Sequence, residues 1–137
     1  TLLNLKVNDS FDLLKDQALI GDKTKTNKLI SETILENEKN IFYLSIINQR
    51  LMKLLEINEI AKNNRIEDAI GKIKPPIFWK DKAIFSLQAR KWNKCKLKKM
   101  LDHTYKVELK IKSNSQITQG LLIKKLLVDI CCLANAS

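Results

Sequence analysis

The stretch NIFYLSIINQRLMKLLEINEIA, residues 40–61, has the clearest helical pattern in the first half of this 137-residue chain. Its apolar residues recur at intervals of three and four, which places them along one side of an α-helix. A helix with such a stripe is expected to bury it against other elements. We therefore predict a long, central helix that begins near Asn40, with the stripe Leu44, Ile47, Leu51, Leu54, Leu55, Asn58 and Ala61.

The rest of the chain also predicts helices. Only 3 Gly and 2 Pro are present, so few positions can supply the tight turns of a hairpin-rich β fold. With 45% hydrophobic residues, the chain is long enough for one all-α domain, and we expect a compact bundle of about six to seven helices. The further helices predicted from periodicity and breakers are Asp9 to Gly21, Asp22 to about Asn37, Arg65 to Ile70 stopped by Gly71, Asp81 to Trp92, Lys94 to about Lys112 capped by Asn93, and about Ile117 to Asn135.

Local signals define several boundaries. Gly21 suits the left-handed position after a helix, and Asp22 can cap the next one. Asn64 and Glu67 have the spacing of a capping box. The segment 74–76, Lys-Pro-Pro, is expected to be an extended connector, because proline disfavours the helical conformation of the residue before it.

The net charge of +10 is unevenly distributed. Residues 1–71 hold 10 Lys+Arg against 11 Asp+Glu, net −1, whereas residues 72–137 hold 15 against 4, net +11. Such asymmetry is expected of a surface that contacts nucleic acid, and the alternative is a solvated lysine surface produced by codon bias. The lysines that we consider for phosphate contacts are Lys74, Lys80, Lys82, Lys99, Lys106 and Lys110.

Catalytic and metal-binding patterns are not evident in the sequence. His103 follows Asp102, but adjacent residues of a helix point in different directions and form no oriented dyad. The spacing of Cys95, Cys131 and Cys132 suits neither a metal site nor a disulfide, which favours a reducing cytoplasm. A glycine-rich phosphate loop is also missing. We therefore expect a non-enzymatic, cytoplasmic domain with no cofactor, no metal and no small-molecule substrate.

The longest apolar stretch is Leu121 to Ala134. It contains Lys124, Lys125 and Asp129, and it is too short to cross a bilayer core of about 30 Å. We expect a core helix that is buried on more than one side, and no membrane partner.

Four aromatic residues, Phe78, Trp79, Phe85 and Trp92, lie close together in the basic half. Aromatic side chains can stack on the bases of a single strand. The alternative is packing, because Phe85 and Trp92 recur at helical spacing, and Phe78 beside the prolines is expected to anchor the connector to the core. Stacking is therefore considered chiefly for Trp79.

The connector and the segments after it resemble a known family. The stretches KPPIFWK (residues 74–80), QARKWN (88–93) and ELKIK (108–112) are similar, in pattern and order, to the C-terminal domain of the bacterial DNA polymerase III delta subunit. Upstream, Phe11 to Leu13 and Gly21 to Asp22 resemble the opening of that domain. The residues that carry the resemblance most clearly are Pro75, Pro76, Phe78, Trp79, Lys80, Arg90, Trp92, Glu108 and Lys112.

This resemblance implies a helical collar domain of a clamp loader. Through it, delta would join the motor subunits and delta prime, and the assembled loader would contact primed DNA. It implies that residues 1–137 are one collar domain, a C-terminal fragment of a delta subunit without its N-terminal AAA+-like module, and a non-catalytic part of a nucleotidyltransferase holoenzyme. In the family, the loop before the last helix approaches template DNA and can carry an aromatic, whereas Ser113 to Gln116 are small or polar. A free-standing basic nucleic-acid-binding module and a generic helical scaffold remain the alternatives.

Overall fold

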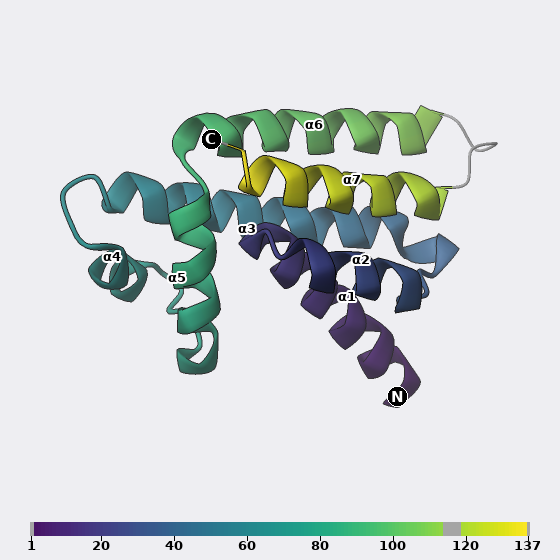
Figure 1. Ribbon diagram of the computed structural model, residues 1–137, viewed down its shortest axis with the longest axis horizontal. Coiled ribbons are helices and arrows are strands. Elements are labelled where there is room, and N and C mark those ends of the chain that lie inside the picture. Colours follow the sequence, from purple (N-terminus) through teal and green to yellow (C-terminus); the bar gives the residue numbers. More distant parts are fainter. Residues whose placement is uncertain (1, 114–118, 137) are drawn as a thin grey trace.

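The computed structural model describes residues 2–113 and 119–136, and every regular element within them is helical (Figure 1). The predicted all-α fold of six to seven helices is confirmed. The elements are α1 (Leu2–Ile20), α2 (Lys23–Glu32), η1 (Asn37–Lys39), α3 (Asn40–Ile60), α4 (Ile66–Lys72), η2 (Trp79–Asp81), α5 (Lys82–Lys91), α6 (Lys94–Ser113) and α7 (Gln119–Ala134), where η denotes a short 3-10 helix.

The long helix α3 runs through the bundle and contacts α4, α5, α6 and α7. Helices α6 and α7 lie side by side, and α7 also packs against α1 and α2 (Figure 1). Helix α5 crosses steeply relative to α6 and contacts α1, α3 and α4. One hydrophobic core joins all seven α-helices or their partly buried flanks.

The predicted stripe of α3 forms a large part of this core. Leu44, Ile47, Leu51 and Leu54 are buried as expected, and Ile57 is buried as well. Each such side chain stabilises the fold by about 1.5–3 kcal/mol relative to an exposed one. The other members of the predicted stripe, Leu55, Asn58 and Ala61, are only half-buried. The predicted start of α3 at Asn40 and its central position are therefore confirmed.

Two predicted boundaries near the N-terminus are wrong. Helix α1 begins at Leu2 rather than Asp9, because the apolar residues before Asp9 continue the helix without a breaker. Helix α2 ends at Glu32 rather than near Asn37, because Thr33 takes an extended conformation with ψ of 126°. The amide of Thr33 still donates to the carbonyl oxygen of Leu29 and so closes the last turn.

Three predicted helix ends are confirmed. Gly21 has φ of +87°, and its amide donates to the carbonyl oxygen of Gln17 at 3.0 Å. The Asp22 carboxylate accepts from the amide of Lys25, and Asn93 caps α6 in the same way. A side-chain acceptor at this position satisfies an amide that has no partner within the helix.

The predicted capping box at Asn64 is wrong. Its amide group donates to the carbonyl oxygen of Ile60 at 2.9 Å, and its oxygen accepts from Nζ of Lys72. Arg65 therefore precedes the first turn of α4 without a side-chain cap. Gly71 does not stop this helix, which continues to Lys72.

A polar network fixes α5 against α1 and α3. Nη1 of Arg50 lies 2.9 Å from Oδ1 of Asp16 and 2.9 Å from Oε1 of Gln88. Nε2 of the fully buried Gln88 donates to the carbonyl oxygen of Asp16 at 3.2 Å. The guanidinium also lies 4.1 Å from the ring centroid of Phe85. Because all three helices contribute, this network ties α5 to both α1 and α3.

Helix α7 is buried through Ile123, Leu126, Leu127 and Ile130. It nevertheless has an exposed row that includes Leu121 and Val128, so burial on more than one side is only partial in the chain described. The predicted start at Ile117 and the loop residues 114–116 lie outside the described residues, whereas Ser113 is the last residue of α6.

Among the described residues, none of the helices combines the length and apolar character needed to cross a bilayer.

Candidate functional site

The six lysines considered for phosphate contacts are exposed, and they form two separate groups. Three lie in the connector and at the start of α5, and three lie on α6. In Figure 1 the start of α5 lies far from α6, because α5 runs from the connector up to the α6 junction. The structure therefore does not bring all six together. The groups are Lys74, Lys80 and Lys82 on one side, and Lys99, Lys106 and Lys110 on the other.

The connector exposes its aromatic side chains. Phe78 is 58% exposed and Trp79 is 70% exposed, so the expectation that Phe78 anchors the connector is wrong. Ile77, at 9% exposure, is the buried side chain instead. The ring centroids of Phe78 and Trp79 are 5.9 Å apart, and Nζ of Lys80 lies 5.5 Å from the Trp79 ring.

The three α6 lysines project from the same side of the helix, as their spacing requires. Lys106 is paired with Asp102 at 3.0 Å, which reduces its availability for phosphate. Lys110 borders a small cavity between α6 and α7, together with Lys125 of α7. The α6 face is therefore basic but partly neutralised.

His103 pairs across this cavity with α7. Its Nε2 lies 2.9 Å from Oδ2 of Asp129, and both side chains are partly exposed. Asp102 is committed to Lys106 instead. The expectation that His103 and Asp102 form no dyad is consistent with these contacts. The pair formed with Asp129 contains no nucleophile and joins the two helices.

The residues that carry the family resemblance lie in structurally distinct places. Trp92 is buried, and its indole donates to the carbonyl oxygen of Leu19 at 2.8 Å. Arg90 pairs with Glu67 of α4. The pKa of the Glu67 carboxyl is lowered, first by a hydrogen bond from the backbone of Glu67 and then by one from the Arg90 side chain. The remaining motif residues are the exposed Pro75 and Pro76 and the ion pair of Glu108 with Lys112 at 3.3 Å.

Groups suited to catalysis or metal binding are sparse. Within residues 2–113 and 119–136, no cluster of three or more His, Cys, Asp or Glu side chains could hold a metal ion. Cys95 and Cys132 are exposed, and Cys131 is buried. Burial raises the pKa of the Cys131 thiol, and a protonated thiol is a poor nucleophile.

Exposed apolar side chains border the seam where α3 meets α6. The salt bridge of Glu59 with Lys94, at 3.3 Å, joins the two helices at one end of the seam. Met52 lies on the same helical row as Glu59, and Tyr105 lies on the same row as Lys94. Ile41 and Leu109 continue these rows toward the other end. We call Ile41, Met52, Tyr105 and Leu109 the α3–α6 surface; their exposed fractions are 42%, 51%, 58% and 46%.

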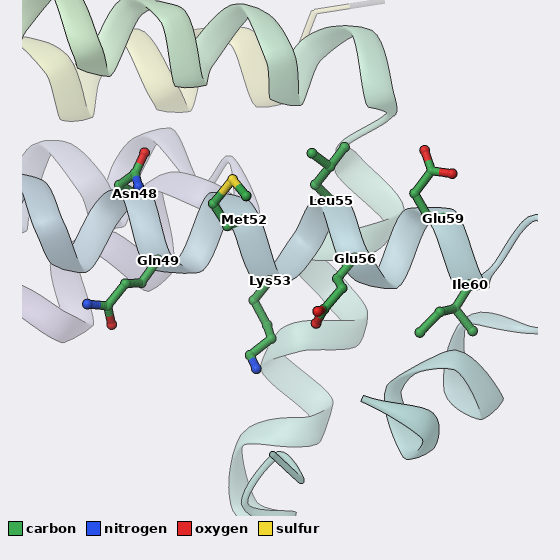
Figure 2. A pocket seen from close by; sticks show the side chains of 8 residues that line it. All are labelled: Asn48, Gln49, Met52, Lys53, Leu55, Glu56, Glu59 and Ile60. Carbon is green, nitrogen blue, oxygen red and sulfur yellow. The ribbon is translucent and has the colours of Figure 1, made fainter. Parts of the chain in front are cut away.

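A shallow groove runs along the exposed side of α3 beside this surface. Figure 2 shows Met52, Leu55 and Glu59 pointing toward α6, whereas Lys53 and Glu56 point toward the side where α5 lies. The groove is therefore apolar at its centre and charged at its margins. Hydrogen bonds from Lys62 and then from Lys94 lower the pKa of the Glu59 carboxyl, so it is ionised at neutral pH.

Sequence reasoning missed the α3–α6 surface and the partner of His103. Tyr105 and Leu109 are one turn apart in a helix whose other exposed residues are mostly charged, and this spacing was the available signal. Asp129 interrupts an apolar helix, which marks it as a residue in need of a partner.

Comparisons with protein-family models, with curated proteins and with solved structures found no match. The relation to the delta subunit therefore rests on the sequence motifs alone.

Proposed function

We propose that this chain is a non-catalytic assembly domain that binds other protein subunits through the α3–α6 surface. The observation that carries the proposal is the alignment of Met52 on α3 with Tyr105 and Leu109 on α6 along one seam. Single exposed apolar residues are ordinary, but adjoining rows of them indicate a binding surface. Tyrosine and methionine are enriched in protein interfaces, and the Glu59–Lys94 pair supplies a charged margin.

We propose further that the assembly is a clamp loader, in which this domain joins the motor subunits and delta prime. The order of the motifs along the chain supports this proposal, as does the all-helical fold. Gln88 and Trp92, both within the stretch QARKWN, also occupy the contacts that hold α5 against α1. A family that retains this motif would thereby retain the crossing of these helices.

The test is assembly with the motor and delta prime subunits of the same organism, measured by size-exclusion chromatography with light scattering. The variant M52E/Y105E places two carboxylates in the α3–α6 surface. Substitution of a central interface residue weakens the free energy of subunit binding by about 2 kcal/mol, which lowers affinity roughly 30-fold. Leu121→Glu is the matched control, because Leu121 is an exposed apolar residue on α7.

We expect the wild-type chain and Leu121→Glu to enter the complex and M52E/Y105E to remain free, with all three equally helical by circular dichroism. A wild-type chain that binds none of these subunits would refute the clamp-loader assignment. A double variant that assembles normally would refute the role of the α3–α6 surface.

A second candidate function is non-specific contact with primed DNA inside the assembled loader. The specific observation is that Lys99 and Lys110 project from one side of α6, and that Lys110 borders a cavity that Lys125 of α7 also lines. Phosphate contacts need charge and reach and no particular base. This contact would strengthen DNA binding by the whole complex without creating sequence preference.

A further inference from the structure

A pocket between α1, α3 and α5 contains more positive charge than the surrounding helix contacts require. Its volume is about 330 Å³, and its apolar lining residues are Ile46 and Phe85. A volume of this size lies at the lower end of the range found for sites that bind small molecules. Three basic side chains also line the pocket; they are Lys15 of α1 and Arg50 and Lys53 of α3.

Lys15 is almost completely buried, which is unusual for a lysine. Its Nζ lies 3.3 Å from Oδ1 of Asp12 and 3.7 Å from Oδ1 of Asp16, so only the first contact is a hydrogen bond. An ammonium group has three donors, and burial of a charge is costly unless the group is paired and hydrogen-bonded. Among the described residues, the contacts of Lys15 therefore leave donors of its ammonium group unused.

Arg50 also keeps one edge of its guanidinium group available. Nη1 is committed to the fold, because it lies 2.9 Å from Oδ1 of Asp16 and 2.9 Å from Oε1 of Gln88. Nε and Nη2 make no hydrogen bond with any residue that the structure describes. These two nitrogens form one edge of the planar group, which can donate two parallel hydrogen bonds to a carboxylate. Arg50 can therefore bind a ligand and retain its contacts to α1 and α5.

Lys53 adds a third positive charge to the pocket. Figure 2 shows its side chain, like that of Gln49, pointing to the side of α3 opposite α6. Lys53 is partly exposed, and no carboxylate pairs with it in the described part of the chain. Among the described residues, three cations line the pocket against two carboxylates that line it or pair with them, those of Asp12 and Asp16. The site therefore has a net charge of +1, which a bound monoanion would neutralise.

This charge and this geometry distinguish between two classes of anion. A carboxylate has one negative charge and two coplanar oxygens, which match the net charge of the site and the available edge of Arg50. A phosphate monoester carries about 1.5 to 2 negative charges at neutral pH, and its excess charge would be repelled by Asp12 and Asp16. Ile46 and Phe85 offer an apolar surface, so the rest of the ligand should be apolar.

We propose that the pocket between α1, α3 and α5 binds the carboxylate of a small ligand with an apolar body. The carboxylate accepts from Nε and Nη2 of Arg50, between Lys15 and Lys53. The apolar body contacts Ile46 and Phe85. The residues of the α3–α6 surface do not line this pocket, so the site goes beyond the proposed assembly function and does not depend on it. Free organic acids and the C-terminus of a peptide both offer this chemistry.

Binding is measured on the full, isotopically labelled chain by chemical-shift titration in NMR. Benzoate is the probe for a free acid, and a short acetylated peptide that ends in leucine is the probe for a C-terminus. The tighter of the two identifies the source of the carboxylate. For benzoate, a ligand of few atoms, we expect a dissociation constant on the order of 10⁻³ M. Benzamide and the amidated peptide keep the shape but lose the charge, and they should cause no saturable shifts.

Two variants test the cations separately. Arg50→Lys keeps a positive charge for Asp16 but lacks the planar edge, so it should weaken benzoate binding about 10-fold to 150-fold. Lys53→Gln removes a cation without a carboxylate partner and should weaken binding about 2-fold to 5-fold. Lys28→Gln, which removes an exposed lysine of α2, is the control and should bind as the wild type does. Circular dichroism checks folding; if Arg50→Lys fails to fold, Lys53→Gln still decides.

Several results would overturn this site. They are no saturable shifts with either acid at about 30 times the expected dissociation constant, equal binding of benzamide, and unchanged affinity in Lys53→Gln. Tighter binding of phenyl phosphate than of benzoate would refute the carboxylate as the ligand class. M52E/Y105E should bind benzoate as the wild type does, so failure of the pocket and failure of the α3–α6 surface are distinguishable.

Discussion

The indole of Trp92 donates a hydrogen bond of 2.8 Å to the carbonyl oxygen of Leu19, a residue 73 positions earlier. Leu19 lies in the last turn of α1, where carbonyl groups lack partners within the helix. The buried ring of Trp92 thus satisfies a helix end and fills the junction between α5 and α6. Packing and hydrogen bonding act at the same place, so this residue should be sensitive to substitution.

We expect Trp92→Phe to lower the free energy of unfolding by about 1–3 kcal/mol, because the carbonyl of Leu19 would remain buried without its donor. Urea unfolding followed by circular dichroism measures the change. Trp79→Phe is the control, since Trp79 is exposed, and it should alter stability by less than about 0.5 kcal/mol. Equal midpoints for the two variants would contradict the importance of the Trp92 contact.

Substitution of Gly21 should destabilise the protein. Its φ of +87° is unfavourable for residues with a Cβ, by about 1–2 kcal/mol, and an added Cβ would lie 2.9 Å from Oδ1 of Asn135. Asn135 also donates to the carbonyl oxygen of Gly21 at 2.7 Å, so relief of the clash would disturb that contact. Thermal unfolding of Gly21→Ala should show a lower midpoint.

Gly71→Ala provides the opposite result. Gly71 lies inside α4, and nothing lies within 4 Å of an added Cβ. Alanine loses less conformational entropy than glycine in a helix, so we expect a stability gain of about 0.5–1 kcal/mol. A loss of stability at both glycines would show that the two local conformations differ from those described.

The sequence predicted the helices better than their ends. The stripe of α3 was recognised because its buried residues recur at helical spacing, and caps such as Asp22 act within one turn. The capping box at Asn64 failed because its side chain is held by Ile60 and Lys72. A short motif cannot indicate which nearby groups compete for the same amide.

The candidate surfaces were less predictable, because exposure depends on how helices pack. Phe78 and Ile77 are adjacent apolar residues, and no local pattern distinguishes the one that is buried from the one that is exposed. The α3–α6 surface requires the antiparallel contact of two helices that are far apart in the chain. The charge asymmetry between the two halves, by contrast, was visible in the sequence. The separation of the candidate lysines into a connector group and an α6 group was not.

The three cysteines should differ in reactivity. Cys95 and Cys132 are exposed and should react rapidly with a disulfide reagent at pH 8, whereas Cys131 is buried with a raised pKa and should react slowly. The variant C95S/C132S isolates the slow thiol, and its rate should rise to that of the others in urea. Rapid reaction of Cys131 in the folded protein would contradict its burial.

The raised pKa of Cys131 also gives stability a direction with pH. The folded protein retains this thiol proton at higher pH than the unfolded chain, whose pKa is near the ordinary value of 9.0. The protonated Cys131 thiol therefore makes its full contribution to the free energy of unfolding below about pH 9, and this contribution is lost as pH rises through the folded-state pKa. Urea unfolding of the wild type and Cys131→Ala between pH 7 and 10 should show a steeper alkaline loss in the wild type.

The three lysines on one side of α6 should differ in how much they contribute to DNA binding. Lys99 and Lys110 lie on one side of the helix without a carboxylate partner among the described residues, whereas Lys106 is already paired with Asp102. K99Q/K110Q should therefore weaken binding of primed DNA by the assembled loader more than Lys106→Gln does. The apolar stripe of α6 is untouched by either change, so folding should persist.

The measurement is anisotropy of labelled primed DNA between 50 and 200 mM salt. Each phosphate that a lysine no longer neutralises should make the dependence of log affinity on log salt shallower by about one unit, because fewer counterions are released. K25Q/K28Q on α2 removes the same charge from another surface and should leave the slope unchanged. If K99Q/K110Q behaves like that control, the α6 face is a solvated surface.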